Sequence, residues 1–281
     1  MAGSGFGTNF RITTWGETHG AGVGVVVDGC PAGLPLERED VQKYLDRRKP
    51  GQSKYTTQRK EGDQVEILSG IFEGRTTGTP ISMVVYNKDQ RSKDYSNIKD
   101  IYRPGHADFT FDMKYGFRDY RGGGRSSGRE TIGRVAAGAV AAKVLKELGI
   151  EIKAYAKAIA GIEVSKDHFD FAEMNNNPFN MPDKEAAKLV QEKADQMIKE
   201  MDSIGGIIEC QITGMPVGIG ETVFDKLDAE LSKAIMSIGS VKGFEIGDGF
   251  EAANLRGSEN NDDFICVDGK RQIILEEFLE E

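Results

Sequence analysis

The segment Val23-Gly24-Val25-Val26-Val27-Asp28-Gly29-Cys30-Pro31-Ala32-Gly33 decides the first half of the predicted fold. Its valine-rich start predicts a buried strand, because a short run of β-branched residues that ends at a turn signal is typical of one. The dipeptide Asp28-Gly29 ends that strand. A helix is predicted over residues 37–48, and Pro50-Gly51 directly after it prevents its continuation. The order is therefore strand, G-x-P-x-G turn and helix.

The same order recurs about 180 residues later in the chain. A second strand is predicted over residues 206–213, Gly214-Met215-Pro216-Val217-Gly218 repeats the turn, and a helix is predicted over residues 225–238. A further strand over residues 241–246 matches one predicted over residues 65–68. The repeat predicts one pseudo-symmetric α+β domain over residues 1–281. Chance similarity of turn residues is the alternative explanation.

The remaining predicted elements alternate between strands and helices. A strand over residues 81–86 is followed by a long loop rich in glycine and arginine, and then by a helix with a small-residue face. A half-buried strand, a polar surface excursion and an amphipathic helix come next. The last four of these elements are predicted over residues 129–148, 150–159, 166–182 and 183–201.

Composition excludes several classes of protein. With 281 residues, 38% of them apolar and 29% charged, the chain is expected to fold as a globular protein. No apolar run approaches the roughly 20 residues of a membrane span, and no secretory signal is recognised, so the cytoplasm is the expected location. Three widely spaced cysteines indicate reduced thiols. No spacing typical of a metal site occurs, so no metal is predicted.

Charge is distributed unevenly along the chain. The formal net charge is −9, yet residues 47–60 carry +6 and residues 114–134 carry +4, which leaves −19 on the remainder. Two cationic segments in an acidic protein predict an anionic ligand, with two solvated basic loops as the alternative. Nucleic acid is disfavoured as a partner, because the overall negative charge repels a long polyanion.

Two of the three histidines are candidates for proton transfer. His19 and His106 lie between small residues in turn-like segments, whereas His168 lies in a polar stretch predicted at the surface. Flanking glycines let a ligand approach closely, and an imidazole can give or take a proton near neutral pH. A structural role for both histidines is the alternative.

The segment 121–131 is a candidate phosphate cradle. It has the sequence Arg-Gly-Gly-Gly-Arg-Ser-Ser-Gly-Arg-Glu-Thr and precedes a predicted helix, so backbone amides, serine hydroxyls and a helix N-terminus come together. It is neither a Walker loop nor a dinucleotide fingerprint. A flexible linker is the alternative. Four cationic residues are expected to add charge-assisted contacts: Arg48, Lys49, Lys54 and Arg59.

These motifs together resemble the chorismate synthase family. The resemblance runs from about residue 5 to residue 271 and implies an α+β β-α-β sandwich, with helices between antiparallel sheets, in a homotetramer. It also implies the anti-1,4-elimination of phosphate from 5-enolpyruvylshikimate 3-phosphate to give chorismate, with reduced FMN, in aromatic amino acid biosynthesis. The motifs are GETHG (16–20), DRRKPGQ (46–52), RPGHAD (103–108), RDYRGGGRSSGRET (118–131), DSIGG (202–206) and VKGFEIGDGF (241–250).

The resemblance also implies roles for individual residues. His106 is expected to protonate the departing phosphate, and His19 to hold a proton at the reduced flavin. Further residues match family positions that bind substrate or NADPH, and others match positions that bind FMN. Two sources of reduced flavin stay open: reduction by this chain with NADPH, or reduction by a separate reductase. The substrate or NADPH positions are Arg48, Lys54 and Arg129, and the FMN positions are Arg125, Ser126, Ser127, Gly239 and Ser240.

The chain departs from the family pattern after about residue 271. Residues 272–281 are interpreted as an aberrant tail, and family segments expected beyond them, including a flavin loop and an aspartate, are not present. One synonymous coding of this tail, read one base earlier, gives nearly the family's next segment, so a frameshift is the hypothesis and resequencing is its test. A chain incomplete in this way is expected to have impaired activity.

Two other functions are kept open. The first is a non-catalytic protein that binds phosphorylated anions, or an inactive partner of a full-length subunit. The second is a histidine phosphatase, which is disfavoured because its nucleophile motif is Arg-His-Gly, whereas His19 follows a threonine.

Overall fold

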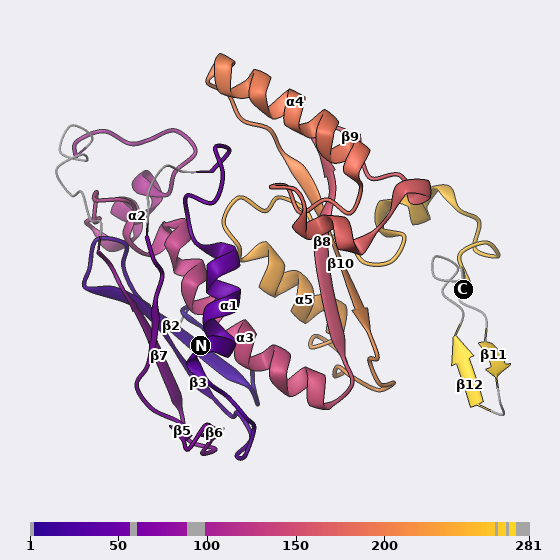
Figure 1. Cartoon of the computed structure of the whole chain (residues 1–281), viewed down its shortest axis with the longest axis horizontal. Coiled ribbons are helices and arrows are strands. Elements are labelled where there is room, and N and C mark those ends of the chain that lie inside the picture. Colours follow the sequence, from indigo (N-terminus) through magenta and orange to yellow (C-terminus); the bar gives the residue numbers. More distant parts are fainter. Residues whose placement is uncertain (1–2, 57–60, 89–98, 262–263, 268–269, 274–281) are drawn as a thin grey trace. The chain divides into compact units, whose positions relative to one another are not determined.

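The computed structural model describes residues 3–56, 61–88, 99–261, 264–267 and 270–273 (Figure 1). The chain divides into two compact units, Met1–Gly218 and Ile219–Glu281. Among its described residues, the first unit contains a five-stranded sheet, a three-stranded sheet and a short two-stranded sheet, all antiparallel, together with helices that pack on the two larger sheets.

The larger sheet of the first unit has the order β1-β2-β3-β7-β4, and all its neighbouring strands are antiparallel. The central strand β3 is the valine-rich segment, and both its neighbours pair with it along six residues. Its burial on both faces explains the nearly continuous apolar run. The strands are β1 (Gly5–Phe6), β2 (Arg11–Gly16), β3 (Gly22–Asp28), β4 (Val65–Ile67) and β7 (Ile81–Tyr86).

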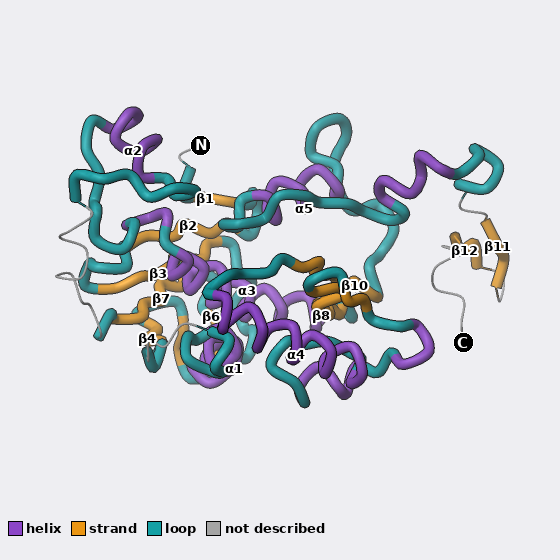
Figure 2. Tube along the Cα trace, turned by 90° about the horizontal axis from the view of Figure 1, so that it is seen from above, coloured by secondary structure: helices purple, strands orange, loops and turns teal. Residues whose placement is uncertain are grey.

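Two helices, α1 (Arg38–Arg48) and α3 (Thr131–Glu147), cover one face of this sheet. They lie between it and the strands β8 and β10 of the smaller sheet (Figures 1 and 2). The side chains of Leu45, Ile132 and Val140 join the valines of β3 in the core. Burying side chains of this size stabilises the fold by about 1.5–3 kcal/mol each. The predicted placement of helices between antiparallel sheets is therefore confirmed.

Close packing of α3 on the sheet requires a small residue at position 133. A Cβ on Gly133 would lie 2.9 Å from Cγ2 of Thr14 and 3.1 Å from the carbonyl oxygen of Gly24. The small-residue face predicted for this helix therefore packs directly on β2 and β3.

The smaller sheet has the order β10-β8-β9 and is also antiparallel. Its strands are β8 (Glu151–Ile159), β9 (Ile162–Glu163) and β10 (Gly206–Thr213). The helix α4 (Lys184–Glu200) begins at Asp183, whose carboxylate accepts hydrogen bonds from the backbone N–H groups of Glu185 and Ala186. This helix forms a second core with β8 through Ala186, Ala187 and Val190.

The antiparallel strand pairs β2–β3 and β8–β10 share one part of the predicted repeat, a strand followed by a G-x-P-x-G turn. Gly29 and Gly214 follow the second strand of each pair and both have a left-handed backbone, with φ of 85° and 74°. A Cβ would lie 1.8 Å from the carbonyl oxygen of Asn9 at the first position and 2.1 Å from that of Gly149 at the second. The same close approach therefore requires glycine at the start of both G-x-P-x-G turns.

Several short elements complete the first unit. Among the described residues they are β5 (Ile71–Phe72), β6 (Arg75–Thr76), the helix α2 (Asp108–Tyr115) and four 3₁₀ turns. The sequence did not predict α2, which lies within the expected glycine- and arginine-rich loop. The turns are η2 (Gly124–Ser126), η3 (Gly128–Glu130), η4 (Lys166–His168) and η5 (Phe171–Asn175).

The second unit contains α5 (Leu227–Met236), the 3₁₀ turn η6 (Gly249–Asn254) and the hairpin β11 (Phe264–Val267) with β12 (Lys270–Ile273). The strand predicted over residues 241–246 is wrong: this segment has no strand structure. The backbone at both its ends bonds locally instead, from Val241 to Ile238 and from Gly249 to Ile246. A strand needs a neighbour to accept its backbone bonds, and apolar alternation alone does not provide one.

No helix among the described residues is long and apolar enough to cross a membrane. The described residues also hold no cluster of three or more histidine, cysteine or acidic side chains with the geometry of a metal site.

Candidate active site

Two consecutive glycines bring the two candidate histidines to one loop. A Cβ on Gly122 would lie 2.6 Å from Nε2 of His19, and a Cβ on Gly123 would lie 2.8 Å from Nε2 of His106. Both glycines have a left-handed backbone, with φ of 66° and 89°. Because consecutive Cα atoms are about 3.8 Å apart, the two imidazoles meet neighbouring peptide groups of the same loop.

His19 lies in the turn between β2 and β3 and is buried, with 6% of its surface exposed. The side chain of Asn87 fixes this turn by donating to the carbonyl oxygens of Glu17 and Gly20 at 2.9 Å each. The neighbouring Thr18 is also buried, and its hydroxyl has no hydrogen-bond partner among the described residues. A buried hydroxyl of this kind is costly unless a ligand or water satisfies it.

His106 lies beside a buried carboxylate just before α2. Nδ1 of His106 lies 3.0 Å from Oδ1 of Asp108. The same carboxylate accepts two hydrogen bonds from the Arg103 side chain, at 2.8 and 2.9 Å, and one from Arg118 at 3.3 Å. Hydrogen bonds from Arg103 hold the pKa of Asp108 well below its usual range. The aspartate therefore stays ionised beside the histidine.

A second buried carboxylate, that of Asp63, joins two arginines from distant parts of the chain. Its oxygens lie 2.7 Å from Nη1 of Arg48, at the end of α1, and 3.1 Å from Nη1 of Arg129, in η3. Burial lowers the pKa of Arg48, although the charge of Asp63 opposes that shift. Two guanidinium groups share one carboxylate here, so a net positive charge remains for an anion.

Arg129 is the more deeply placed of these two arginines. Its Nη2 donates to Oδ1 of Asn87 at 3.1 Å, the same side chain that fixes the turn of His19. Its buried Nε has no hydrogen-bond partner among the described residues. Arg129 therefore connects the arginine pair with the histidine turn and keeps one N–H for a ligand.

The three predicted flavin residues of the loop are already engaged within the protein. Arg125 donates to the carbonyl oxygens of Gly16 and Thr14, at 3.0 and 3.2 Å. The hydroxyl of Ser126 donates to the carbonyl oxygen of Gly123 at 2.7 Å, and that of Ser127 accepts from the backbone N–H of Arg129. These contacts fix the loop on β2, and a flavin role for the residues stays a prediction.

Three other residues were predicted to bind substrate, NADPH or FMN. Nζ of Lys54 lies 2.7 Å from Oδ1 of Asp195 on α4, and the lysine side chain is 59% exposed. The structure therefore gives Lys54 an ion-pair partner outside the arginine pair. Gly239 and Ser240 lie in the second unit, just after α5. Their predicted roles stay predictions.

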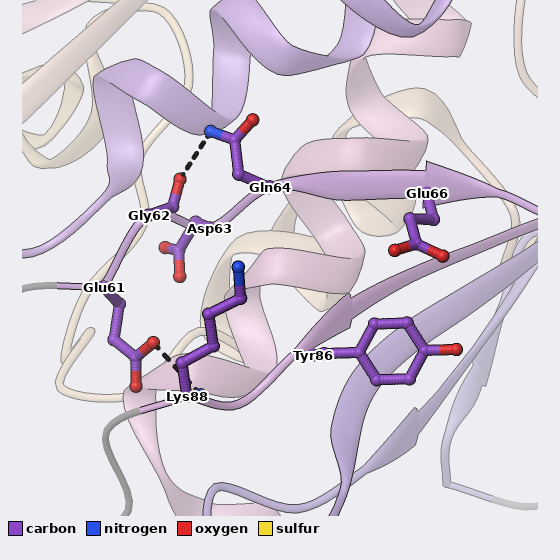
Figure 3. Close-up of a pocket in the computed structure, with 7 residues that line it drawn as sticks. All are labelled: Glu61, Gly62, Asp63, Gln64, Glu66, Tyr86 and Lys88. Carbon is purple, nitrogen blue, oxygen red and sulfur yellow. Dashed lines mark hydrogen bonds between the residues drawn. The ribbon is translucent and has the colours of Figure 1, made fainter.

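A small cavity of about 40 Å³ adjoins Asp63 (Figure 3). Its lining includes Glu61, Asp63, Glu66 and Lys88 but neither candidate histidine. Three carboxylates make it a poor site for an anion, and its volume suits water. The loop carrying the histidines is therefore the candidate site, and this cavity is not.

Three charged residues of the site were not assigned a role from the sequence. Asp108 and Arg103 lie in the same six-residue motif as His106, so their spacing was a usable signal. Asp63 had no such signal, because its partners are 15 and 66 residues away.

Fold and site together define an α+β enzyme with an arginine-rich, histidine-bearing site for an anionic substrate. The family model described as chorismate synthase matches residues 10–276. Curated chorismate synthases of Lachnospira eligens and Agathobacter rectalis are 69% and 64% identical to this chain. The matches cover 96% of this chain and 74% and 73% of those proteins.

A crystal structure of a chorismate synthase gives a TM-score of 0.78 at 32% identity, covering 95% of this chain and 78% of that one. The chain belongs to the chorismate synthase family, whose members are lyases. This family assignment was predicted from the motifs and is confirmed.

Proposed function

We propose that the site eliminates phosphate from 5-enolpyruvylshikimate 3-phosphate to form chorismate, with reduced FMN, as a step toward the aromatic amino acids. The single observation that carries the proposal is the meeting of two imidazoles at Gly122 and Gly123, beside arginines held by Asp63. A substrate with one phosphate and two carboxylates needs such cationic groups, and the departure of phosphate needs a proton donor.

The residues present fit a bound flavin. A planar ring with polar edges needs exposed backbone and hydrogen-bonding groups directed toward it. The glycine loop supplies the backbone, while the unsatisfied hydroxyl of Thr18 and the imidazole of His19 supply polar atoms. When bound, reduced FMN supplies an electron that assists the departure of phosphate and is recovered by the end of the reaction.

The arginine pair binds the anionic groups of the substrate. Arg48 and Arg129 keep their fork-like guanidinium groups in fixed positions, because each donates to one oxygen of Asp63. A guanidinium held in this way loses little side-chain entropy on binding an oxyanion. The pair therefore orients the substrate and leaves proton transfer to the histidines.

His106 gives its proton to the oxygen of the departing phosphate. In the reaction one carbon–oxygen bond breaks, phosphate leaves, and a hydrogen is lost from the opposite face of the ring. General acid catalysis by a positioned histidine typically contributes about 10²–10⁴-fold to the rate. His19, buried in the turn after β2, would hold a proton for the reduced flavin.

An anaerobic turnover assay with chemically reduced FMN tests this function. We expect one phosphate released for each chorismate formed, and we expect His106→Asn to lower kcat by about 10²–10⁴-fold. His168→Asn is the control, because His168 is exposed beside Glu185 and contacts no part of the site. Substrate binding without phosphate release from the unsubstituted protein would contradict the proposal.

We further propose a homotetramer in the cytoplasm, with NADPH or a separate reductase as the source of electrons. The smaller sheet offers a surface suited to assembly, since Ile207 and Ile208 of β10 are 55% and 69% exposed beside a bulge. Light scattering of Ile208→Lys checks this, because a charge buried in an interface disfavours association. An unchanged tetramer would exclude β10 from the interface.

A further inference from the structure

Asp108 is the most heavily hydrogen-bonded carboxylate near the candidate histidines. Only 2% of its side chain is exposed. Oδ2 accepts from the backbone N–H and from Nε of Arg103, at 3.1 and 2.8 Å, while Oδ1 accepts from Nη2 of Arg103 and Nη1 of Arg118. With two arginines around it, the carboxylate has one fixed orientation.

Oδ1 of this carboxylate also faces the imidazole of His106, which creates a choice of tautomer. Nδ1 of His106 lies 3.0 Å from Oδ1 of Asp108 and 3.2 Å from Nη2 of Arg103. A neutral imidazole carries one N–H. If Nδ1 donates to Asp108, Nε2 holds the lone pair; if Nδ1 accepts from Arg103, Nε2 holds the hydrogen.

The protonation state that catalysis needs decides between them. A histidine that donates a proton starts as the imidazolium, in which both ring nitrogens carry hydrogen. Arg103 has no acceptor for an Nδ1–H, whereas Oδ1 of Asp108, at 3.0 Å, carries the negative charge that can accept it. Nε2 is the ring nitrogen that faces the glycine loop, since a Cβ on Gly123 would lie 2.8 Å from it.

We propose that Asp108 is the positioning residue for proton transfer by His106: it accepts the Nδ1–H, so that Nε2 is the nitrogen that gives and regains the proton. The inference deepens the proposed function and rests on it for the identity of the proton acceptor. The imidazolium gives its Nε2 proton to an oxygen of the departing phosphate and becomes the neutral Nδ1–H tautomer. Asp108 stays ionised throughout, and His106 regains its proton from solvent.

Nitrogen NMR of the unsubstituted protein labelled with ¹⁵N-histidine tests the tautomer without any need for activity. With the ring neutral at alkaline pH, we expect His106 to show a protonated Nδ1 and an unprotonated Nε2. The His106→Asn variant assigns the signal. His168 is the internal control, because its Nδ1 lies 3.5 Å from an exposed Glu185 and nothing buries the pair. A proton on Nε2 of neutral His106 would overturn the proposal.

The Asp108→Asn variant then connects the tautomer with catalysis. An asparagine amide can donate to Nδ1, so we expect the hydrogen to move to Nε2 and kcat to fall on the order of 10²-fold, with KM within about threefold. Glu185→Gln is the matched control and should change neither the His106 signals nor kcat.

The outcomes separate the two claims. If the tautomer changes in Asp108→Asn while kcat does not, proton donation by His106 is wrong and the positioning by Asp108 stands. If the variant keeps the Nδ1–H tautomer, the positioning is wrong. Should the variant fail to fold, the spectrum of the unsubstituted protein still decides which nitrogen carries the hydrogen.

Discussion

Asp63 and Asp108 are both buried carboxylates that organise cations, but they do so over different distances along the chain. The partners of Asp108 lie two, five and ten residues away, in the motif of His106 and just after the helix that follows it. The partners of Asp63 lie 15 and 66 residues away, at the end of α1 and in η3. In the proposed function, the first carboxylate orients a proton donor, whereas the second holds an anion-binding pair.

If the proposed roles hold, this difference separates catalysis from binding within one site. Removing Asp108 changes the state of one imidazole and leaves the arginine pair in place. Removing Asp63 leaves two arginines without their shared counter-charge, although Arg48 at the end of α1 still donates to the carbonyl oxygen of Gly128 in η3. The first change is expected mainly in kcat, and the second in stability and in KM.

The largest effect is expected from Gly123→Ala, which changes the position of His106, the histidine beside Asp108. The new Cβ would meet Nε2 of His106 at 2.8 Å, so the ring must move and turnover should fall about 10²–10⁴-fold. Gly116→Ala is the matched control: its φ of 78° imposes similar backbone strain, but no atom lies within 4 Å. Measuring kcat for both variants separates the clash from the strain. Equal losses would mean that His106 is not the affected group.

Asp63→Ala should have the largest effect on stability. Removing one partner of a buried ion pair costs about 3–5 kcal/mol, because the remaining charges keep their desolvation penalty. Asp28→Ala is the control, since Asp28 pairs with Arg11 at 3.0 Å on the surface, and exposed pairs are worth about 0–1 kcal/mol. Urea unfolding measures the loss in the free energy of unfolding for both variants. Similar losses would show that Asp63 does not compensate the buried charges of Arg48 and Arg129.

Acid unfolding measures how much the ionised carboxylate of Asp108 contributes to the free energy of unfolding. Hydrogen bonds from Arg103 depress the folded-state pKa of Asp108. Its stabilisation is therefore fully present above the unfolded-state pKa of about 3.9 and is lost as the pH falls through the lower folded-state pKa. The free energy of unfolding should fall more steeply below about pH 4 in the unsubstituted protein than in Asp108→Asn, by about 2–3 kcal/mol in all. Parallel curves would contradict this.

The smallest effect is expected at Lys54, which pairs with neither Asp63 nor Asp108. Its partner Asp195 is also solvent-accessible, and the hydrogen bond between them raises the pKa of Lys54. We expect Lys54→Met to change KM by less than about threefold and Arg48→Met to raise it about tenfold or more. Substrate titrations of the two variants compare them directly. A larger effect at Lys54 would support its predicted role in anion binding.

Much of the fold could be predicted from periodicity and turn residues. The strand β3, the helices α1, α3 and α4 and both G-x-P-x-G turns occur where the pattern placed them. The strand expected over residues 241–246 failed because apolar alternation predicts a strand only if a neighbour accepts its backbone bonds. The helix α2 was missed because its residues followed a run dominated by glycine, proline and arginine.

The sequence by itself determined the family, the two histidine motifs and the local group of Arg103, His106 and Asp108, because residues so close in the chain meet whenever the turn forms. Only the tertiary structure decided that His19 and His106 approach consecutive glycines, and that Asp63 joins Arg48 with Arg129. The packing of α1 and α3 on the sheet creates those contacts, and no local pattern encodes a pairing across 66 residues.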